Sequence, residues 1–319
     1  MLPLTADCPK PLLPVGPWTL VEHQVAALAT AGVERIVLST GYRHADFHDL
    51  VVRLRATDVE LITTVEESPL GTGGGLRVAL RALPDAEEVI VLNGDLLSGH
   101  DLGAQVDRLT AAPAHVMGVV HVREVADARP YGSVLADDLG RITAFVEKSP
   151  SPPSRTVNAG TYVVRHELLR DIATSGPTSL EREVFPALVE RRALLAHRED
   201  AYFLDVGSPA ALVTANRDLL MAPWPGAATT PRGPALVLPG AQVHASAVLT
   251  AGTVVHPGAV IGAGAHLESA VVLTGAHVGE GSRIIRSVIG RGAHVSAGAD
   301  VIDDALGTAE SKPPPSAFP

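Results

Sequence analysis

The sequence is short of cysteine, of positive charge and of long apolar segments, and each shortage excludes a class of protein. Its 319 residues contain a single cysteine, Cys8, which rules out a disulfide within the chain and fits a reducing compartment. No apolar run approaches the ~18–20 residues that cross a bilayer, and the N-terminus lacks a signal-peptide layout. The net charge of -10 argues against nucleic acid or an anionic membrane as a partner. We therefore expect a cytoplasmic globular protein.

Lysine is also scarce. Only three of the 25 Lys and Arg residues are lysines, namely Lys10, Lys148 and Lys312. Arginine presents a planar fork of donors, whereas lysine is a compact point charge that can follow a moving phosphate. Chance or a salt bridge also explains a rare lysine, so this observation alone leaves Lys10 and Lys148 as candidates for phosphate contacts.

Residues 1–222 alternate β-rich and helix-like segments. Residues 33–39 and 89–93 have the composition of strands, and 19–31 and 102–109 have helical spacing. This alternation predicts an α/β domain with a doubly wound, Rossmann-like, mostly parallel sheet. Ligands of such sheets bind beyond the carboxyl ends of the strands, where Asn93-Gly94-Asp95 lies.

The texture changes after a Pro- and Gly-rich segment over 223–236, which we interpret as a linker. Apolar residues then fall every six positions in three successive groups. The register slips by one position between one group and the next. A six-residue period with glycine at turns predicts a hexapeptide β-helix, here a small left-handed parallel one over 237–308. We expect residues 309–319 to form a disordered tail. The periodic residues are Val243, Leu249, Val255, Ile261, Leu267 and Leu273, then Val278 and Ile284, then Ile289, Val295 and Val301.

A series of motifs covering nearly all of residues 2–220 resembles the sugar-1-phosphate nucleotidyltransferases, or NDP-sugar pyrophosphorylases. Each motif is weak alone, but the set occurs in the family's order. Within the family, the set most resembles mannose-1-phosphate guanylyltransferase. Members of that group often carry a C-terminal hexapeptide β-helix. The motifs are PLTADCPKPLLPVGPWTLVEHQVAALATAGVERIVLSTGY, VEESPLGTGGGLR, VLNGDLLSG, PYGSV, FVEKS, NAGTYVV, SLEREVFPAL and YFLDVGSP.

The family's reaction explains the residue types. An oxygen of a sugar 1-phosphate attacks the α-phosphorus of an NTP in line and pyrophosphate leaves, so catalysis is mostly positioning and charge neutralisation. The resemblance implies that Asp95 and Asp205 hold Mg²⁺, which takes carboxylates together with substrate phosphates. It further implies that Lys10 serves the NTP phosphates and Lys148 the sugar phosphate. The alternatives are a helix N-cap for Asp95 and a turn aspartate before Gly207 for Asp205.

The sugar-binding residues also come from the resemblance. Glu147 and Asn158 correspond to contacts with sugar hydroxyls, and Gly132 to a place where the backbone approaches the sugar closely. Glu181 is a further sugar candidate. The segment SLERE around it could equally be a capping box, with a glutamate accepting from backbone amides.

The choice of base is predicted from the segment 66–75. The family's base-reading position falls on Glu66, or on Glu67 if the alignment shifts by one. A carboxylate only accepts hydrogen bonds, and guanine offers it two adjacent donors, so guanine is favoured over the other bases. We expect the glycines of this segment to allow close approach of a flat base, with Gly71, Thr72 and Gly94 also contacting the nucleotide.

The chain departs from the family at its beginning. Family members open with a strand and a loop of the type GGxGTRLxPLT, whereas Met1–Thr5 starts directly after the place for those glycines. From the sequence we expect either a start further upstream or a silent relative, and little turnover from a chain lacking this loop.

Several functions compete on the sequence alone. The first is GTP:mannose-1-phosphate guanylyltransferase, with a glucose-1-phosphate or cyclitol-phosphate enzyme using another NTP as the variant. A catalytically silent subunit that senses an NDP-sugar is the second class. A hexapeptide acyltransferase using His256 or His277 is the third, and it leaves the first domain unexplained. We expect a homo-oligomer with residues 237–308 in the interface, since the ends of short β-helices commonly need covering.

Overall fold

The computed structural model describes residues 1–54, 59–228 and 232–313. Contacts between residues divide the chain into two compact units, and each unit draws on separate stretches of sequence. The first unit comprises Met1–Ala27, Gly94–Gly99 and Leu204–Pro319, and the second comprises Leu28–Asn93 and His100–Phe203. This division differs from the linear one predicted from the sequence, because both ends of the expected 1–222 domain group with the residues that follow it.

The second unit contains a mixed six-stranded sheet in the order β11-β7-β10-β8-β9, with β5 also paired to β10. The α/β class is confirmed, but the sheet is not mostly parallel. Strand β10 runs antiparallel to β5, β7 and β8, and only β11 and β7 pair in parallel. Short loops join β8, β9 and β10, and parallel pairing needs a long crossover. The bounds are β5 Glu88–Leu92, β7 Gly118–Glu124, β8 Gly132–Ala136, β9 Ile142–Glu147, β10 Thr156–Arg165 and β11 Leu194–Arg198.

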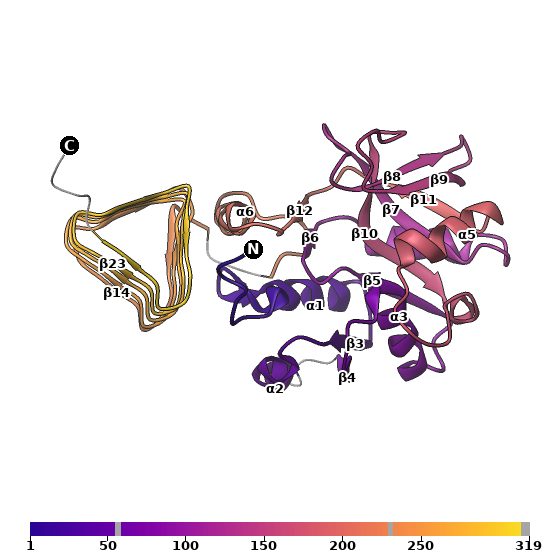
Figure 1. The fold of residues 1–319 in the computed structure, drawn as a ribbon, viewed down its shortest axis with the longest axis horizontal. Helices are drawn as coiled ribbons and strands as arrows, with labels where there is room; N and C mark the ends of the chain where they lie inside the picture. Colours follow the sequence, from indigo (N-terminus) through magenta and orange to yellow (C-terminus); the bar gives the residue numbers. More distant parts are fainter. Residues whose placement is uncertain (55–58, 229–231, 314–319) are drawn as a thin grey trace. The chain divides into compact units, whose positions relative to one another are not determined.

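A separate parallel pair is formed by β3 (Arg35–Thr40) and β4 (Glu60–Val65). In the described part of the chain, β3 pairs only with β4 and β5 only with β10. Helices of this unit lie beside its sheets (Figure 1). They are α2 His48–Leu54, α3 Gly71–Ala82, α4 Leu102–Thr110, α5 Phe185–Glu190, the 3₁₀ helices η2 His44–Phe47 and η3 His166–Arg170, and the π-helical turn η4 Leu180–Val184.

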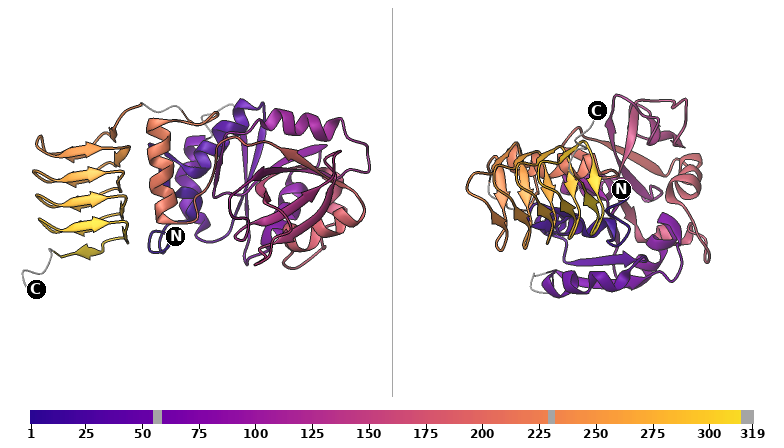
Figure 2. Two further views of the ribbon diagram at one scale, coloured as in Figure 1. Left: turned by 90° about the horizontal axis from the view of Figure 1, so that it is seen from above. Right: turned by 60° about the vertical axis from the view of Figure 1, so that its left-hand side comes forward.

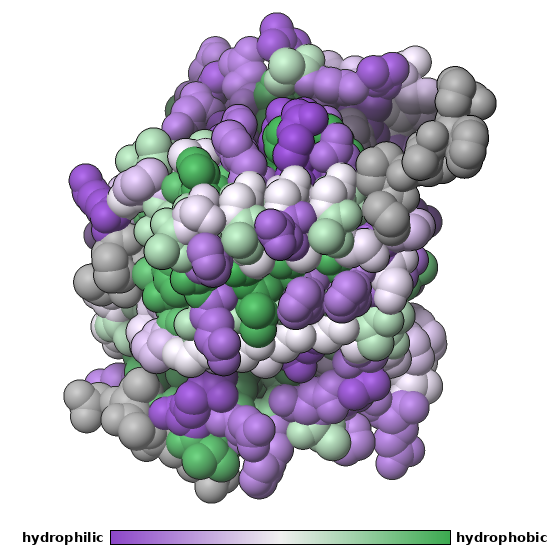
Figure 3. Space-filling view, turned by 90° about the vertical axis from the view of Figure 1, so that its left-hand side faces the viewer, coloured by the Kyte–Doolittle hydropathy of each residue, from purple (hydrophilic) through white to green (hydrophobic). Residues whose placement is uncertain are grey.

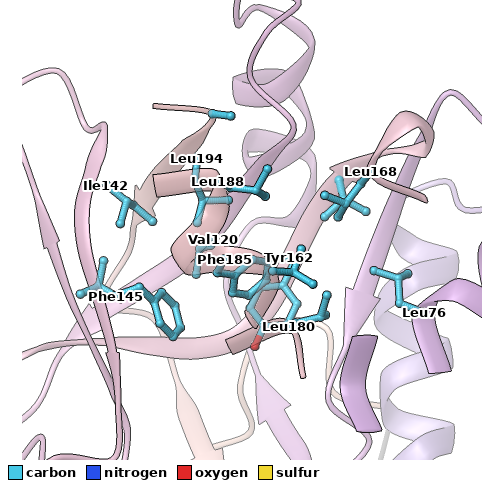
Figure 4. Close-up of a cluster of buried hydrophobic side chains, with 14 of the residues drawn as sticks. Leu76, Val120, Ile142, Phe145, Tyr162, Leu168, Leu180, Phe185, Leu188 and Leu194 are labelled. Atoms are coloured by element: carbon cyan, nitrogen blue, oxygen red, sulfur yellow. The ribbon is translucent and has the colours of Figure 1, made fainter. Parts of the chain in front are cut away.

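The core of the second unit is built around aromatic rings (Figure 4). The Tyr162 ring from β10 lies 4.9 Å from the Phe185 ring of α5, measured between centroids, in an edge-on arrangement. Leucines from α3, η3, η4 and α5 complete this cluster, among them Leu76, Leu180 and Leu188. Edge-on rings and buried leucines stabilise a core mainly through the apolar area removed from water.

The N-terminal part of the first unit holds a short hairpin against a helix. Its elements are η1 Lys10–Leu12, β1 Pro14–Val15, β2 Trp18–Thr19, the start of α1 Leu20–Thr30, β6 Leu96–Ser98, β12 Phe203–Asp205 and α6 Pro209–Met221. The buried Asn216 of α6 accepts from the Gly16 N–H at 2.8 Å and donates to the Pro14 carbonyl at 3.2 Å. Since Pro14 follows η1 closely, these bonds also restrict the segment that carries Lys10.

The C-terminal part of the first unit is a parallel β-helix (Figures 1 and 2). Three parallel sheets stack its coils, in the orders β13-β16-β19-β22-β25, β14-β17-β20-β23-β26 and β15-β18-β21-β24. Side chains of similar hydropathy line up in rows in Figure 3, which faces this part of the chain. The strands are β13 Ala235–Val237, β14 Gln242–Val243, β15 Val248–Thr250, β16 Thr253–Val255, β17 Val260–Ile261, β18 His266–Glu268, β19 Val271–Val272, β20 His277–Val278, β21 Arg283–Ile285, β22 Val288–Ile289, β23 His294–Val295, β24 Asp300–Ile302, β25 Ala305–Leu306 and β26 Ser311–Lys312.

The structure corrects the register of this repeat by one position. Val255 pairs with Val272, so Val272, and not Leu273, is the inward residue, and the slip follows Leu267 directly. The shortened step falls at a corner where Ser269 adopts a left-handed backbone with φ of 46°. Corners at Arg286 and Asp303 repeat this conformation, with φ of 46° and 51°. The shortened steps thus share a left-handed residue that is not glycine, whereas the six-residue steps that follow Val255 and Ile261 turn at Gly258 and Gly264.

The ends of the β-helix also differ from the prediction. Ala235 already belongs to β13, so the repeat begins inside the predicted linker 223–236. Residues Ser311–Lys312 form β26 and pair with β23, because the periodic backbone continues past 308. The predicted tail therefore starts no earlier than Pro313. Residues 229–231 of the linker and 314–319 of the tail lie outside the described residues.

Candidate active site

Lys10, Asp95 and Asp205 come together in the first unit. The Lys10 Nζ lies 2.6 Å from Asp95 Oδ2 and 3.8 Å from Asp205 Oδ1. Side-chain exposure is 26% for Lys10, 38% for Asp95 and 40% for Asp205, so the cluster remains open to a ligand. Two carboxylates aimed at one cation and accessible to solvent form a site that can hold positive charge beside a polyphosphate.

The backbone explains why these residues meet. Asp95 follows the carboxyl end of β5 after Asn93-Gly94, and Asp205 ends β12. The Val206 N–H donates to the Asp95 carbonyl at 3.0 Å, which fixes the two aspartates side by side. Asp95 is not a helix cap, because Asp101 caps α4 by accepting from the Ala104 N–H.

The glycine-rich segment at the start of α3 packs against Thr178. The N–H groups of Gly73 and Gly74 donate to the Thr178 carbonyl at 2.8 and 3.2 Å, and the Thr178 N–H donates to the Leu70 carbonyl at 2.8 Å. A Cβ at Gly71 would lie 2.6 Å from the Thr178 carbonyl oxygen, and the Gly71 φ of 71° also disfavours a side chain. The protein's own backbone therefore requires these glycines, a reason that the sequence did not reveal.

Glu66 anchors the same segment. Its Oε2 accepts from the Leu70 N–H at 3.0 Å, and a Cβ at Gly75 would lie 2.8 Å from its Oε1. One face of the Glu66 carboxylate is thus committed to the start of α3. The neighbouring Glu67 is exposed. The two alternatives for the base-reading carboxylate differ in this way, and both remain predictions.

Glu181 lies at the centre of a hydrogen-bond network in the second unit. Its Oε2 accepts from the hydroxyls of Thr72 at 2.7 Å and Ser179 at 3.0 Å. Its Oε1 accepts from the hydroxyl of Tyr162 at 3.1 Å. The Tyr162 hydroxyl oxygen in turn accepts from Asn158 Nδ2 at 2.8 Å. The predicted nucleotide residue Thr72 and the predicted sugar residues Asn158 and Glu181 are thereby joined.

The capping-box alternative for Glu181 is resolved by its neighbour. Ser179 is the N-cap of η4 and accepts from the Arg182 N–H, while Glu183 Oε1 accepts from the Ser179 N–H at 2.8 Å. Glu183 therefore supplies the reciprocal capping contact. Because Glu183 takes that role, the Glu181 carboxylate is left to the hydroxyl network.

Asn158 and Tyr162 flank a β-bulge that the sequence did not predict. The register of β10 against β7 shifts between these two residues, and Gly160 there has φ of 67°. The Gly160 N–H donates to Asn158 Oδ1 at 2.9 Å, which holds the amide in place. Tyr162 was missed as a site residue, although its spacing from Asn158 in NAGTY was a usable signal. Bulges of this kind re-aim side chains next to active sites.

Glu147, Lys148 and Gly132 occupy the β8–β9 hairpin. A Cβ at Gly132 would lie 2.7 Å from Glu147 Oε2, so the glycine makes room for the carboxylate of its cross-strand partner. Burial, and secondarily the nearby Glu181 carboxylate, raise the pKa of Glu147 above its ordinary value. Lys148 has a left-handed φ of 45° and is largely exposed, with its Nζ 3.9 Å from Glu147 Oε1. A hydroxyl-accepting carboxylate and a largely exposed ammonium group thus stand at adjacent positions.

The two histidines considered for acyl transfer, His256 and His277, lie in different environments. His256 is 5% exposed, and burial lowers its pKa to about 4. The His277 ring stacks on that of His294 at 4.8 Å along one face of the β-helix. No helix in the described ranges is long and apolar enough to cross a membrane.

Comparison with known proteins first gives the class. Residues 1–221 match the nucleotidyl transferase family, and residues 231–310 match the GMPPB C-terminal domain. The first match covers more than half of the chain, which therefore belongs to the nucleotidyl transferase family and is an enzyme of nucleotide-sugar biosynthesis. This outcome confirms the resemblance read from the motifs.

Particular relatives narrow the comparison. A mannose-1-phosphate guanylyltransferase from Mycobacterium tuberculosis is 37% identical over 274 residues, which cover 85% of this chain and 75% of that protein. The mannose-1-phosphate guanylyltransferase catalytic subunit beta of Drosophila melanogaster is 33% identical, and the match covers 66% of this chain and 57% of that protein. The mannose-1-phosphate guanyltransferase of Saccharomyces cerevisiae is likewise 33% identical, over 65% of this chain and 58% of that protein. The matched region thus spans less than two thirds of the last two relatives.

Solved structures agree on the fold. HddC from Yersinia pseudotuberculosis, complexed with GMP-PN, matches with a TM-score of 0.56 and 26% identity, covering 67% of this chain and 92% of that one. A putative glucose-1-phosphate thymidylyltransferase from Bacillus anthracis matches with a TM-score of 0.61 and 21% identity, covering 68% of this chain and 88% of that one, and supports the fold alone.

Proposed function

We propose that this enzyme transfers GMP from GTP to mannose 1-phosphate and releases pyrophosphate. A phosphate oxygen of the sugar 1-phosphate forms a bond to the α-phosphorus of GTP, and the bond from that phosphorus to the pyrophosphate oxygen breaks. The product is GDP-mannose. The observation that supports the reaction most directly is the convergence of Asp95 and Asp205 on Lys10. We expect the reaction to run in the cytoplasm, as inferred from the single cysteine.

In this proposal Lys10 and Lys148 neutralise the two polyanions. Lys10, held by Asp95, contacts the GTP phosphates, and the exposed Lys148 contacts the phosphate of the sugar. Lys10 thereby stabilises the charge that develops on the pyrophosphate leaving group, and electrostatic stabilisation is the largest single effect in many enzymes. Lys10 is held by its carboxylates, whereas the left-handed turn after β9 fixes only the backbone from which the exposed Lys148 side chain extends.

Asp95 and Asp205 fit a Mg²⁺ ion. They are hard oxygen donors, they converge on one cation position, and both are partly exposed. In the described part of the chain no group of three or more His, Cys, Asp or Glu side chains is arranged to hold a metal, so phosphate oxygens and water would complete the coordination. When bound, Mg²⁺ would supply charge neutralisation of the triphosphate. Binding of the ion would require Lys10 to give up its contact with one of the carboxylate oxygens.

The preference for guanine rests on a carboxylate and on the relatives. Glu66, or the exposed Glu67, can accept from the two adjacent donors of guanine, whereas uracil and thymine present a single ring donor. Relatives named for guanylyl transfer, and a solved relative complexed with GMP-PN, support the same base. Gly71, Thr72 and Gly94 remain the other predicted nucleotide contacts.

The sugar would be bound by acceptors that can pair with hydroxyl groups. Glu147 and Glu181 supply carboxylates and Asn158 an amide; neighbours in the second unit hold Glu181 and Asn158 by hydrogen bonds, and Glu147 is partly buried beside them. A neutral, hydroxyl-rich ring donates hydrogen bonds to such groups, which is why clustered carboxylates suit a sugar better than its phosphate. Gly132, by lacking a side chain, leaves room for the Glu147 carboxylate.

Activity measurements test the proposal. Purified enzyme is incubated with Mg²⁺, mannose 1-phosphate and each of GTP, UTP, ATP, CTP and dTTP, and pyrophosphate release and the nucleotide sugar are quantified. We expect GTP to be used best, with GDP-mannose as the product. Preference for UTP or ATP would refute the guanine assignment, and glucose 1-phosphate as the better acceptor would refute the sugar. Binding of GDP-mannose without turnover of any pair would favour a sensing subunit.

We also infer a homo-oligomer formed through the β-helix. The apolar side chains of Val237, Val248 and Ile302 are between 41% and 48% exposed there. Static light scattering should give a smaller assembly for a chain ending at Pro223 than for the full chain. Equal, monomeric masses for both chains would contradict this inference.

A further inference from the structure

The nucleotide loop, defined here as residues 66–75, is tied to a second segment over 178–181 by contacts that span about a hundred residues of sequence. The Thr72 hydroxyl donates to Glu181 Oε2 at 2.7 Å and accepts from the Leu180 N–H at 2.9 Å. Backbone bonds between Thr178 and the loop run alongside these contacts. A displacement of Thr72 must therefore displace Glu181 or break two hydrogen bonds.

The other oxygen of Glu181 belongs to the sugar-binding side of the network. Tyr162, 1% exposed, donates to Glu181 Oε1 and accepts from Asn158. The Tyr162 ring is packed against Phe185, so its hydroxyl has one position available (Figure 4). Asn158 in turn is fixed by the Gly160 N–H in the bulge. The network thus runs without a gap from the nucleotide loop to two predicted sugar contacts.

Such a network transmits binding energy because its members are not independent. The Thr72–Glu181 bond is a charge-assisted contact at an exposed position, while Tyr162 at the other end of the network is buried, where such bonds are stronger. A nucleotide that shifts or restrains residues 66–75 also shifts or restrains Thr72 and, through it, the Glu181 carboxylate. The sugar phosphate then binds a carboxylate already in place and loses less conformational entropy. Coupling of this kind is reciprocal between the two ligands.

We propose that Thr72 is a positioning residue that couples nucleotide binding to sugar-phosphate binding through Glu181. The inference rests on the proposed function, since it takes the loop as the nucleotide site and Glu181 as part of the sugar site. Thr72 acts here through Glu181, in addition to its predicted contact with the nucleotide. Binding of the correct nucleotide would then increase the affinity of the site for the sugar phosphate.

The test measures the Kd of mannose 1-phosphate by calorimetry, without nucleotide and with a saturating α,β-methylene analogue of GTP, which cannot transfer its nucleotidyl group. The ratio of the two Kd values is the coupling. We expect about 5–150-fold tightening in the wild type, the usual range for coupled sites. Thr72→Val should bring the ratio to within about threefold of one, and Thr72→Ser, which keeps the hydroxyl, should restore it.

Thr110→Val is the matched control. Thr110 also donates to a glutamate, Glu88 Oε2 at 2.9 Å, but it lies at the end of α4 and outside the network. Its ratio should equal that of the wild type. A Thr72→Val protein that weakens both affinities and leaves the ratio unchanged would overturn the inference, as would a wild-type ratio of one.

The outcome separates the inference from the proposed function. If wild-type enzyme makes GDP-mannose but Thr72→Val keeps the wild-type ratio, only the coupling is wrong. If GTP and mannose 1-phosphate are not substrates, the proposed function is wrong. The same ratio is then measured with the NTP analogue and sugar phosphate that do support turnover, and loss of coupling in Thr72→Val remains the supporting result.

Discussion

The β-helix and the Glu181 network both join residues that are distant in sequence, and they do so by opposite means. In the β-helix each residue meets the equivalent residue of the next coil, as His277 meets His294. The Glu181 network joins unlike residues at irregular separations, such as Thr72 with Glu181 and Asn158 with Tyr162. Periodic contacts therefore appear in the sequence as a repeat, whereas single polar contacts leave no sequence pattern.

The largest expected effect separates function from stability. Asp95→Asn should lower kcat/KM by about two to four powers of ten, or ~3–5 kcal/mol, because a carboxylate that orders Lys10 and can hold Mg²⁺ is lost. Its melting temperature should stay close to that of the wild type. Asp303→Asn is the matched change in the β-helix, where the carboxylate is also paired with a cation. It should leave kcat/KM unchanged, and equal losses in both variants would contradict the site.

A core deletion in the β-helix should have the reverse signature. Ile284 is fully buried among the stacked inward residues, so Ile284→Ala should cost about 2–5 kcal/mol of unfolding free energy. Chemical denaturation followed by circular dichroism measures this cost. Ile302→Ala, at a side chain that is 41% exposed, should cost much less. Similar costs at the two positions would show that the inward face is wrongly assigned.

Acid should destabilise both the sheet of the second unit and the β-helix, because each contains a buried histidine. Burial, and next the neighbouring His100, lower the pKa of His121 to about 3, and its Nε2 lies 3.0 Å from the Glu199 carbonyl. The unfolded chain protonates this imidazole near its ordinary pKa of 6.5, so stability is complete above that pH and falls as the pH drops towards 3. From pH 6.5 to 5 the loss should be about 2 kcal/mol.

Variants assign this acid sensitivity to its source. His121→Gln should flatten the dependence of unfolding free energy on pH in this window, and His256→Gln should do the same for the β-helix. Both sets of denaturation curves are measured at pH 7 and pH 5. An unchanged difference between the two pH values in His121→Gln would mean that other groups cause the loss.

The smallest effect is expected at a β-helix corner. Arg286 and Asp303 form an exposed ion pair, and both have left-handed backbones. Exposed pairs contribute little, so Arg286→Ala should leave the melting temperature nearly unchanged. Arg286→Gly should be at least as stable as the alanine variant, since glycine accepts this backbone without strain. A glycine variant that melts clearly below the alanine variant would mean that the corner conformation is not the controlling factor.

Much of the fold and part of the site could be predicted from the sequence. Strands β3 and β5, helices α1 and α4, and the six-residue repeat all carry local periodicity. The family resemblance selected Lys10, Asp95 and Asp205 as site residues, but the contact of Lys10 with the two carboxylates comes from the structure. The bulge at Gly160 and the contact of Thr178 with the glycine-rich segment were not predicted. Each depends on how one strand or loop lies against another, which local periodicity does not report.

The sequence by itself determined the α/β class, the β-helix with its approximate limits, and the acidic and basic residues available for chemistry. It did so because apolar spacing and residue type act locally. Only the tertiary structure decided that Glu183, and not Glu181, caps η4, that Val272 faces inward, and that Tyr162 connects Asn158 to Glu181. Hydrogen bonds require distances near 3 Å between specific atoms, and only the packed chain brings such atoms together.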